Sequence, residues 1–142
     1  EAVYDGRRDE IIVTPEGGEH RVGDLAEAIL LQTPGQKLAY ATDFADTRDN
    51  RERLAALAQG AHSLFCEATF MLEDSAQAQR TFHLTTRACA EIANRAGVGQ
   101  LLPFHFSRRY TRRLPDVYRE IASFCPRVQL PDFMATADLD AP

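Results

Sequence analysis

The chain has 142 residues, of which 44% are hydrophobic and 26% are charged, and these proportions are typical of a globular domain. This length suits one domain and excludes a two-domain enzyme. No apolar run approaches the roughly 20 residues that span a bilayer, and the N-terminus has no signal-peptide pattern. Three cysteines without CxxC spacing, each among apolar neighbours, indicate reduced core residues: Cys66, Cys89 and Cys125. We therefore expect a soluble, cytoplasmic protein without a membrane partner.

The first part of the sequence predicts short elements, with no repeat, low-complexity tract or obvious linker. Residues 11–14 predict a strand that ends in the turn-forming sequence Pro15-Glu-Gly-Gly18. Residues 22–31 suit either a short helix or an extended return, and Thr33-Pro-Gly35 predicts a turn. The nearly continuous apolar run over residues 38–42 predicts a strand in the centre of a sheet.

The remaining segments alternate predicted helices and strands. Apolar runs predict strands over residues 63–66 and 100–104, and a last short strand over residues 127–130. Helical spacing of apolar residues predicts helices over residues 49–60, 85–96 and 115–124, with a loop or short helix over residues 74–79. We expect the tail to Pro142 to be loosely ordered. This alternation favours an α/β layer with largely parallel strands.

Polar side chains follow three of the predicted strands. Asp43, Glu67 and His105 each come at the carboxyl end of an apolar run. In open α/β sheets, ligands bind at the edge formed by the carboxyl ends of the strands. We therefore expect these three side chains to share one site.

Glu67 and His83 form the first candidate pair. Glu67 ends an apolar run and would be costly to bury without a partner. His83 stands just ahead of a predicted helix, whose N-terminal dipole disfavours an imidazolium ion. Pairing the two side chains would resolve both problems, and the carboxylate would hold the imidazole in one tautomer. His83 could then deliver a proton to a leaving oxygen.

Asp43 and His105 form the second candidate pair. Alone, each is a weak signal, because an aspartate or histidine after a strand is most often a structural residue. Together they supply the carboxylate and imidazole ligands that suit zinc or manganese. An aspartate that bridges two metals, with histidines as terminal ligands, is the two-metal hydrolase arrangement. The alternative is a non-catalytic binding or assembly module in which both are ordinary polar residues.

An arginine-rich stretch follows His105. Between residues 100 and 130, two acidic residues stand against six arginines, although the net charge of the whole chain is −5. These arginines are Arg108, Arg109, Arg112, Arg113, Arg119 and Arg127. One interpretation is a solvated helix face, and the other is a rim that binds phosphate, because arginine forks match phosphate oxygens.

Several motifs in their order along the chain resemble the C-terminal half of ribonuclease Z. These enzymes are tRNA 3′-processing endonucleases of the metallo-β-lactamase superfamily. The resemblance covers residues 35–110 and lies in Tyr40-Ala-Thr-Asp43, Gly60-Ala-His-Ser-Leu-Phe-Cys-Glu-Ala-Thr-Phe70, His83-Leu-Thr-Thr86, Ala90-Glu-Ile-Ala93 and His105-Phe-Ser-Arg-Arg-Tyr110. The combination is much more specific than any single motif.

The resemblance implies a role for each of these positions. Asp43 would bridge two metal ions and His105 would be a terminal metal ligand, with two zinc ions in a complete site. Glu67 and His83 would be the acid and histidine pair that assists phosphodiester cleavage. The segment with Ser107, Arg109 and Tyr110 would lie near the substrate phosphate.

The resemblance also implies that residues 1–142 are the C-terminal portion of an αββα sandwich domain. The HxHxDH motif, which supplies most metal ligands in the superfamily, is absent from this sequence. We therefore expect an N-terminal half as partner, as a second chain or a cleaved segment, and we also consider a homodimer. The expected substrate is RNA. Relatives with the same half-site hydrolyse small phosphodiesters or sulfate esters, so these substrates are the alternative.

Overall fold

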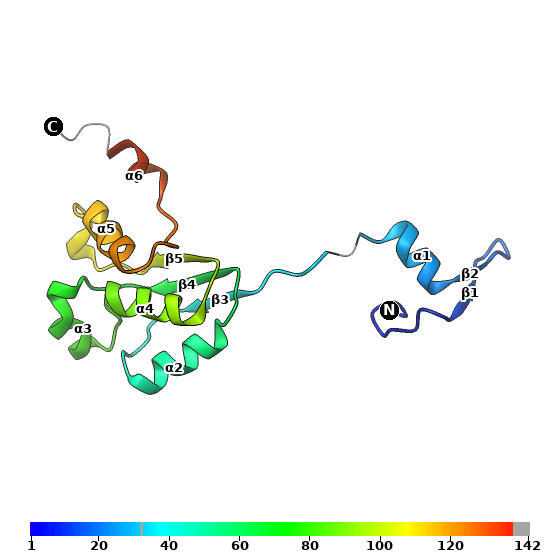
Figure 1. The fold of residues 1–142 in the computed structure, drawn as a ribbon, viewed down its shortest axis with the longest axis horizontal. Coiled ribbons are helices and arrows are strands. Elements are labelled where there is room, and N and C mark those ends of the chain that lie inside the picture. The colour runs from blue at the N-terminus through cyan, green and yellow to red at the C-terminus, as the bar shows by residue number, and fades with distance from the viewer. Residues whose placement is uncertain (32, 138–142) are drawn as a thin grey trace. The chain divides into compact units, whose positions relative to one another are not determined.

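The computed structural model describes residues 1–31 and 33–137 and divides the chain into two compact units, Glu1–Gly35 and Gln36–Pro142 (Figure 1). The sequence predicted no linker between parts of the chain and a turn at residues 33–35, and both predictions are wrong. Residues 33–37 form neither a turn nor regular secondary structure. Pro34 lacks an amide proton and disfavours helical geometry in the residue before it, which accounts for an irregular segment here.

The first unit is a hairpin followed by a helix. Strands β1 (Ile11–Val13) and β2 (Glu19–Arg21) pair in antiparallel fashion, with Ile12 opposite His20. Helix α1 spans Val22–Ile29, so of the two predictions for this segment the helix is confirmed. Its buried face includes Val22 and Ala26, which lie one turn apart.

The second unit contains a parallel sheet of three strands. Strands β3 (Leu38–Ala41), β4 (Ser63–Glu67) and β5 (Gln100–Phe104) lie in the order β3-β4-β5. The parallel pairing predicted from the sequence is confirmed. The central position predicted for residues 38–42 is wrong, because among the described residues β4 is central and β3 lies at the edge. An apolar run shows that both faces of a strand are apolar, but it does not identify the neighbouring strands.

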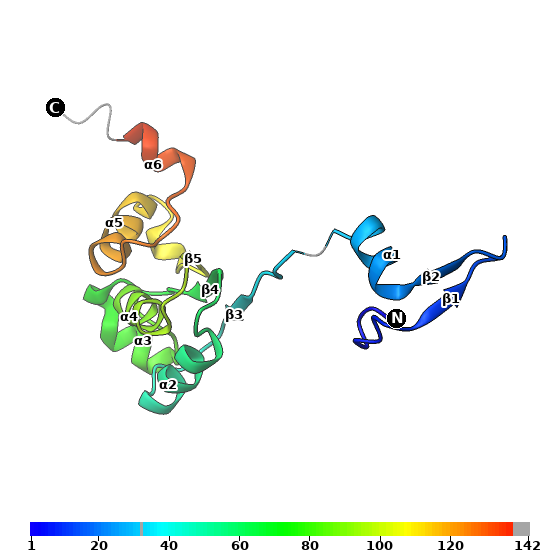
Figure 2. The same cartoon turned by 45° about the vertical axis from the view of Figure 1, so that its right-hand side comes forward.

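Helices pack against one face of this sheet. The helical segments are η1 (Leu72–Asp74), η2 (Arg108–Tyr110), α2 (Arg48–Leu57), α3 (Ser75–Thr81), α4 (Thr86–Ala96), α5 (Leu114–Phe124) and α6 (Asp132–Ala137). Helix α4 contacts β4 and β5 and is flanked by α2 and α5 (Figures 1 and 2). The buried core under these helices includes Leu64, Leu101, Ile92 and Ile121. No helix among the described residues is long and apolar enough to span a membrane.

The opposite face of the sheet, called the open face below, carries apolar side chains: Leu38, Tyr40, Phe65, Leu102 and Phe104. Leu38 and Tyr40 are 62% and 63% exposed, and the other three are half-buried. The rings of Tyr40 and Phe104 stack with centroids 5.1 Å apart. A parallel sheet is normally covered on both faces, so this face differs from the usual arrangement within the described residues.

The helix ends follow the sequence signals closely. Thr85 caps α4 by accepting a hydrogen bond from the Ala88 amide, and Gly97 ends the helix with φ +63°. Pro115 lies in the first turn of α5, as predicted. The cap of α2 is Thr47 rather than the segment that begins at Asp49, because the Thr47 side chain accepts from the Asn50 amide.

The C-terminal segments differ from the prediction. Residues 127–130 do not form a strand, because only Val128 makes an isolated bridge, to Leu101. Part of the tail predicted to be loosely ordered is helix α6, and residues 138–142 lie outside the described residues.

The three cysteines are buried and free, as expected for reduced core residues. A hydrogen bond to Cys66 and then burial raise the pKa of the Cys89 thiol well above its usual value. Because the thiolate is the reactive form, this favours an inert thiol.

Replacing Gly97 tests the end of α4. Gly97→Ala is expected to lower the free energy of unfolding by about 1 kcal/mol, because alanine pays a steric cost in the left-handed conformation. Urea denaturation followed by circular dichroism would measure the change. Gly35→Ala is the control, since Gly35 lies outside the left-handed region and a Cβ there meets no atom within 4 Å. Equal losses in both variants would contradict the prediction.

Candidate metal centre

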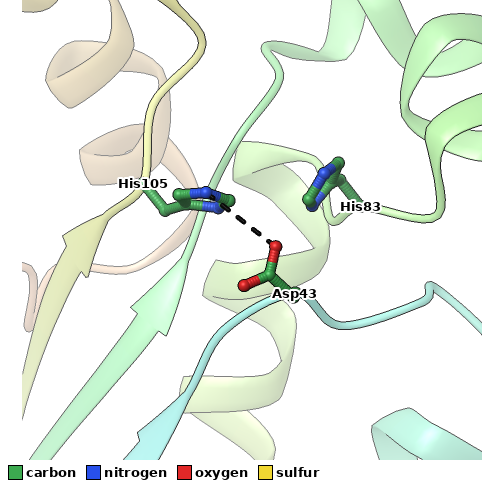
Figure 3. A group of neighbouring side chains, drawn as sticks. All are labelled: Asp43, His83 and His105. Atoms are coloured by element: carbon green, nitrogen blue, oxygen red, sulfur yellow. Dashed lines mark ion pairs between the residues drawn. The ribbon is translucent and has the colours of Figure 1, made fainter.

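The candidate residues meet at the carboxyl ends of the three parallel strands. Asp43 lies two residues after β3, Glu67 is the last residue of β4, and His105 directly follows β5. His83 comes from the segment between α3 and α4. The structure therefore brings residues from separate strand ends to one place, and Figure 3 shows Asp43 and His105 there together with His83.

Asp43 and His105 both have left-handed backbone conformations, with φ values of +51° and +60°. Such conformations are uncommon for residues other than glycine, and aspartate and histidine are among the side chains that tolerate them best. Residues held in sparsely populated backbone regions cluster at functional sites. The sharp change of direction lets each side chain leave its strand axis at the same edge.

Three side chains form a group that could hold a metal ion. Asp43, His83 and His105 each offer one ligand atom, and these atoms all lie within 4.8 Å of one another. His105 Nε2 lies 4.0 Å from Asp43 Oδ1. Figure 3 shows the two imidazoles and the carboxylate turned toward a common point. One carboxylate and two imidazoles are a donor set that zinc accepts, so these residues fit the metal that the sequence predicts.

His83 takes part in two groups. The sequence assigned it to proton transfer, and the structure places it beside Glu67 as predicted, with His83 Nδ1 2.9 Å from Glu67 Oε2. The structure also places it with the candidate metal ligands. The division of roles between His83 and His105 therefore stays a prediction.

Glu67 is completely buried, and each of its carboxylate oxygens accepts a hydrogen bond. The Phe44 amide donates to Oε1. Oε2 accepts from the Thr69 hydroxyl at 2.5 Å, from His83 and, at 3.4 Å, from the Leu84 amide. These donors offset the cost of burying the charge.

Thr69 belongs to the site but was not among the residues predicted from the sequence. The signal was its position two residues after Glu67, because alternate residues of an extended segment point to the same side. Its hydroxyl contacts Glu67 and also lies 3.2 Å from His105 Nδ1.

The loop that carries Asp43 is held by a second charged group that the sequence did not predict. Arg51 on α2 binds both carboxylate oxygens of Asp46 and donates to Glu91 on α4 at 2.8 Å. The hydrogen bond to Asp46 is the main reason that the pKa of Arg51 is raised. The loop after β3 is therefore tied to two helices.

The three residues expected near substrate phosphate differ in their environments. Ser107 lies beside the site, because its amide donates to the Thr69 carbonyl. Arg109 is exposed and pairs with Asp74 at 2.6 Å. Tyr110 is 1% exposed, and its hydroxyl donates to Asp74 and accepts from the Met71 amide. Tyr110 thus anchors this segment, and a phosphate contact would require the hydroxyl to leave these partners.

The other arginines divide into paired and unpaired side chains. Arg113 binds Glu73 and Asp116, and Arg119 also binds Asp116. Within the described residues, Arg108, Arg112 and Arg127 form no ion pair. The paired Arg113 and Arg119 match the interpretation as a solvated helix face. The three arginines without an ion pair in the described part of the chain are free to contact an anion.

Comparisons with known proteins agree with this geometry. The family model described as the beta-lactamase superfamily domain matches residues 12–106. A ribonuclease Z from Deinococcus radiodurans is 39% identical over 94 residues, which are 66% of this chain and 28% of that protein. A ribonuclease Z from a Nostoc species is 37% identical over 133 residues, covering 90% of this chain and 39% of that protein. This chain therefore spans well under half of the length of these curated relatives.

A solved structure supports the fold. The metallo-beta-lactamase fold protein YhfI from Bacillus subtilis aligns with a TM-score of 0.57 at 15% identity, covering 86% of this chain and 44% of that one. The fold predicted from the resemblance is confirmed as a mixed α/β structure of the metallo-β-lactamase type. The resemblance to ribonuclease Z is confirmed as well.

The buried hydroxyl of Tyr110 predicts how the free energy of unfolding changes at alkaline pH. Burial, with the hydrogen bond to Asp74, raises the pKa of Tyr110 from its usual 10.0 to about 12. The folded state holds this proton more tightly than the unfolded state, so the free energy of unfolding should fall as the pH rises between these two values. Tyr110→Phe should show a weaker fall over this range in urea denaturation series.

The control for this experiment is Tyr4→Phe, since Tyr4 is 83% exposed. This variant should keep the pH dependence of the wild type. A Tyr110→Phe curve parallel to the wild type would contradict the prediction.

Proposed function

Because this chain belongs to the beta-lactamase superfamily, we propose that residues 1–142 form the C-terminal part of a metal-dependent phosphodiester hydrolase that resembles ribonuclease Z. The observation that carries this proposal is the meeting of Asp43, His83 and His105 at one point beside the buried Glu67. Carboxylate and imidazole donors gathered at the carboxyl edge of a sheet suit hydrolytic chemistry.

Each residue of the site has a role in this proposal. Asp43 and His105 would hold the metal, which we expect to be zinc, with manganese as an alternative. When bound, a metal pair supplies activation of water. Glu67 accepts a hydrogen bond from His83 Nδ1 and so orients the ring. His83 Nε2 would take up a proton from solvent, with the Glu67 carboxylate stabilising the resulting imidazolium, and would give this proton to the leaving oxygen.

The proposed substrate is RNA. The relatives named ribonuclease Z support this class of substrate, and Arg108 and Arg112, which form no ion pair with the described residues, follow His105 in the sequence. Cleavage of a tRNA precursor should fall steeply with salt, because phosphate contacts release counterions. Hydrolysis of bis-p-nitrophenyl phosphate with no cleavage of the precursor would favour the alternative, a hydrolase of small phosphodiesters or sulfate esters.

We also propose that an N-terminal half completes the domain. The open face presents Leu38 and Tyr40 to solvent, and the curated relatives are more than twice as long as the segments matched here. An uncovered apolar sheet face is an association surface. A second copy of the chain on this face is the alternative, and it would give a homodimer.

The division of roles gives a prediction for the assembly of both halves. His105→Ala should lose bound metal, because it removes a proposed ligand. His83→Ala should keep most of the metal and lose turnover by about 100-fold or more, as for removal of a general acid. Metal content by plasma emission spectroscopy and turnover of a tRNA precursor would be measured on the same samples. Equal metal loss in both variants would contradict this division.

The same assembly tests whether the site is catalytic at all. His62→Ala is the matched control, because His62 binds the Lys37 amide outside the site. If neither zinc nor manganese is bound, and Asp43→Ala and His105→Ala leave activity unchanged, the non-catalytic binding or assembly module is the better explanation.

The open face gives a further prediction. The double variant Leu38→Ser with Tyr40→Ser should weaken association with an N-terminal segment, such as that of the Nostoc relative, by about 10-fold or more, because two apolar side chains no longer contribute buried area. Sedimentation velocity would measure association. Leu72→Ser, which replaces an exposed apolar side chain on η1 rather than on a strand, should have no effect. Unchanged association of the double variant would exclude the open face as the interface.

A further inference from the structure

Thr69 bridges the buried carboxylate and one of the candidate metal ligands. Its hydroxyl oxygen lies 2.5 Å from Glu67 Oε2 and 3.2 Å from His105 Nδ1. The side chain is 6% exposed. Its backbone is held as well, because the Thr69 carbonyl accepts from the Ser107 amide, two residues beyond His105. The hydroxyl therefore has little freedom to turn elsewhere.

The direction of these hydrogen bonds follows from the groups involved. An ionised carboxylate can only accept, and a hydroxyl has one proton to give. The short contact to Glu67 uses the Thr69 proton, so the Thr69 oxygen is left as an acceptor toward His105. His105 must then donate from Nδ1, which leaves Nε2 with a free lone pair.

His83 reaches the same state by a direct contact. Its Nδ1 lies 2.9 Å from Glu67 Oε2, so this nitrogen also carries the proton. Both rings therefore keep Nε2 free, and His105 Nε2 is the atom that lies 4.0 Å from Asp43 Oδ1. One carboxylate thus determines the proton positions of both histidines, directly for His83 and through Thr69 for His105.

We propose that Thr69 is a positioning residue that extends the influence of Glu67 to His105 and holds this ring in the Nδ1–H tautomer, with Nε2 available to a metal ion. The hydrogen-bonding partners of metal-binding histidines commonly have this effect on tautomer and orientation. The metal part of the inference rests on the proposed function. The tautomer part rests on the contacts of Thr69 alone, so the two can be tested separately.

Nitrogen NMR of the metal-free chain tests the tautomer. The chain has four histidines, so the ring nitrogens of ¹⁵N-labelled histidine give a simple spectrum at about pH 8.5, where an ordinary imidazole is neutral. We expect His105 in the Nδ1–H form. His62 provides an internal reference of the opposite form, because its Nδ1 accepts from the Lys37 amide at 2.9 Å. A wild-type His105 with its proton on Nε2 would overturn the proposal without any variant.

Two substitutions and a control then test the bridge. Thr69→Val keeps the shape but removes the hydroxyl, and it should shift His105 toward the Nε2–H form. In the assembly of both halves, the same change should weaken zinc binding by about 10- to 100-fold, measured by competition with a chromophoric chelator. Thr69→Ser keeps the hydroxyl and should restore both readouts. Thr86→Val removes another buried threonine hydroxyl, which binds Glu120 away from the site, and should change neither.

The outcomes separate this inference from the proposed function. If Thr69→Val leaves the His105 tautomer unchanged, or shifts it without weakening zinc binding, the positioning role is overturned. If the assembly of both halves binds no zinc but Thr69→Val still shifts the tautomer in the metal-free chain, the bridge through Thr69 is supported and the metal assignment fails.

Discussion

The buried carboxylate of Glu67 is the interaction on which the rest of the site depends. It sits at the end of the central strand with no exposure to solvent, so its charge requires donors from the protein. Those donors come from three separate segments: the loop after β3, the residues after β4 and the segment before α4. Satisfying one charge therefore brings together the segments that carry Asp43 and His83. His105 joins them through Thr69.

The parallel sheet explains why these segments can meet. Because β3, β4 and β5 run in the same direction, their carboxyl ends lie at one edge. Left-handed backbone at Asp43 and His105 turns both side chains toward that edge. The helices on one face supply the core that holds the strands, and Arg51 ties the Asp43 loop to α4. The open face is apolar without being buried, which fits a domain whose second layer lies elsewhere.

Much of the fold could be predicted from local sequence. The helix that begins after Thr85 and ends at Gly97 was recognisable, because the apolar stripe, the cap and the left-handed stop are all short-range signals. Strand order was not recognisable, and β3 was wrongly placed in the centre. The segment over residues 127–130 was wrongly predicted as a strand because apolar content alone does not supply a neighbour along its whole length.

The sequence by itself determined the candidate residues Asp43, Glu67, His83 and His105. It also determined the pairing of Glu67 with His83, because burying a carboxylate without a partner is too costly and the partner had to be close in the fold. Only the tertiary structure decided that Thr69 bridges Glu67 and His105, and that Tyr110 is an anchor bound to Asp74. The Thr69–His105 and Tyr110–Asp74 contacts each join residues 36 positions apart along the chain. Hydrogen bonds of this kind depend on where the strands and loops lie in space, which no local pattern of residues records.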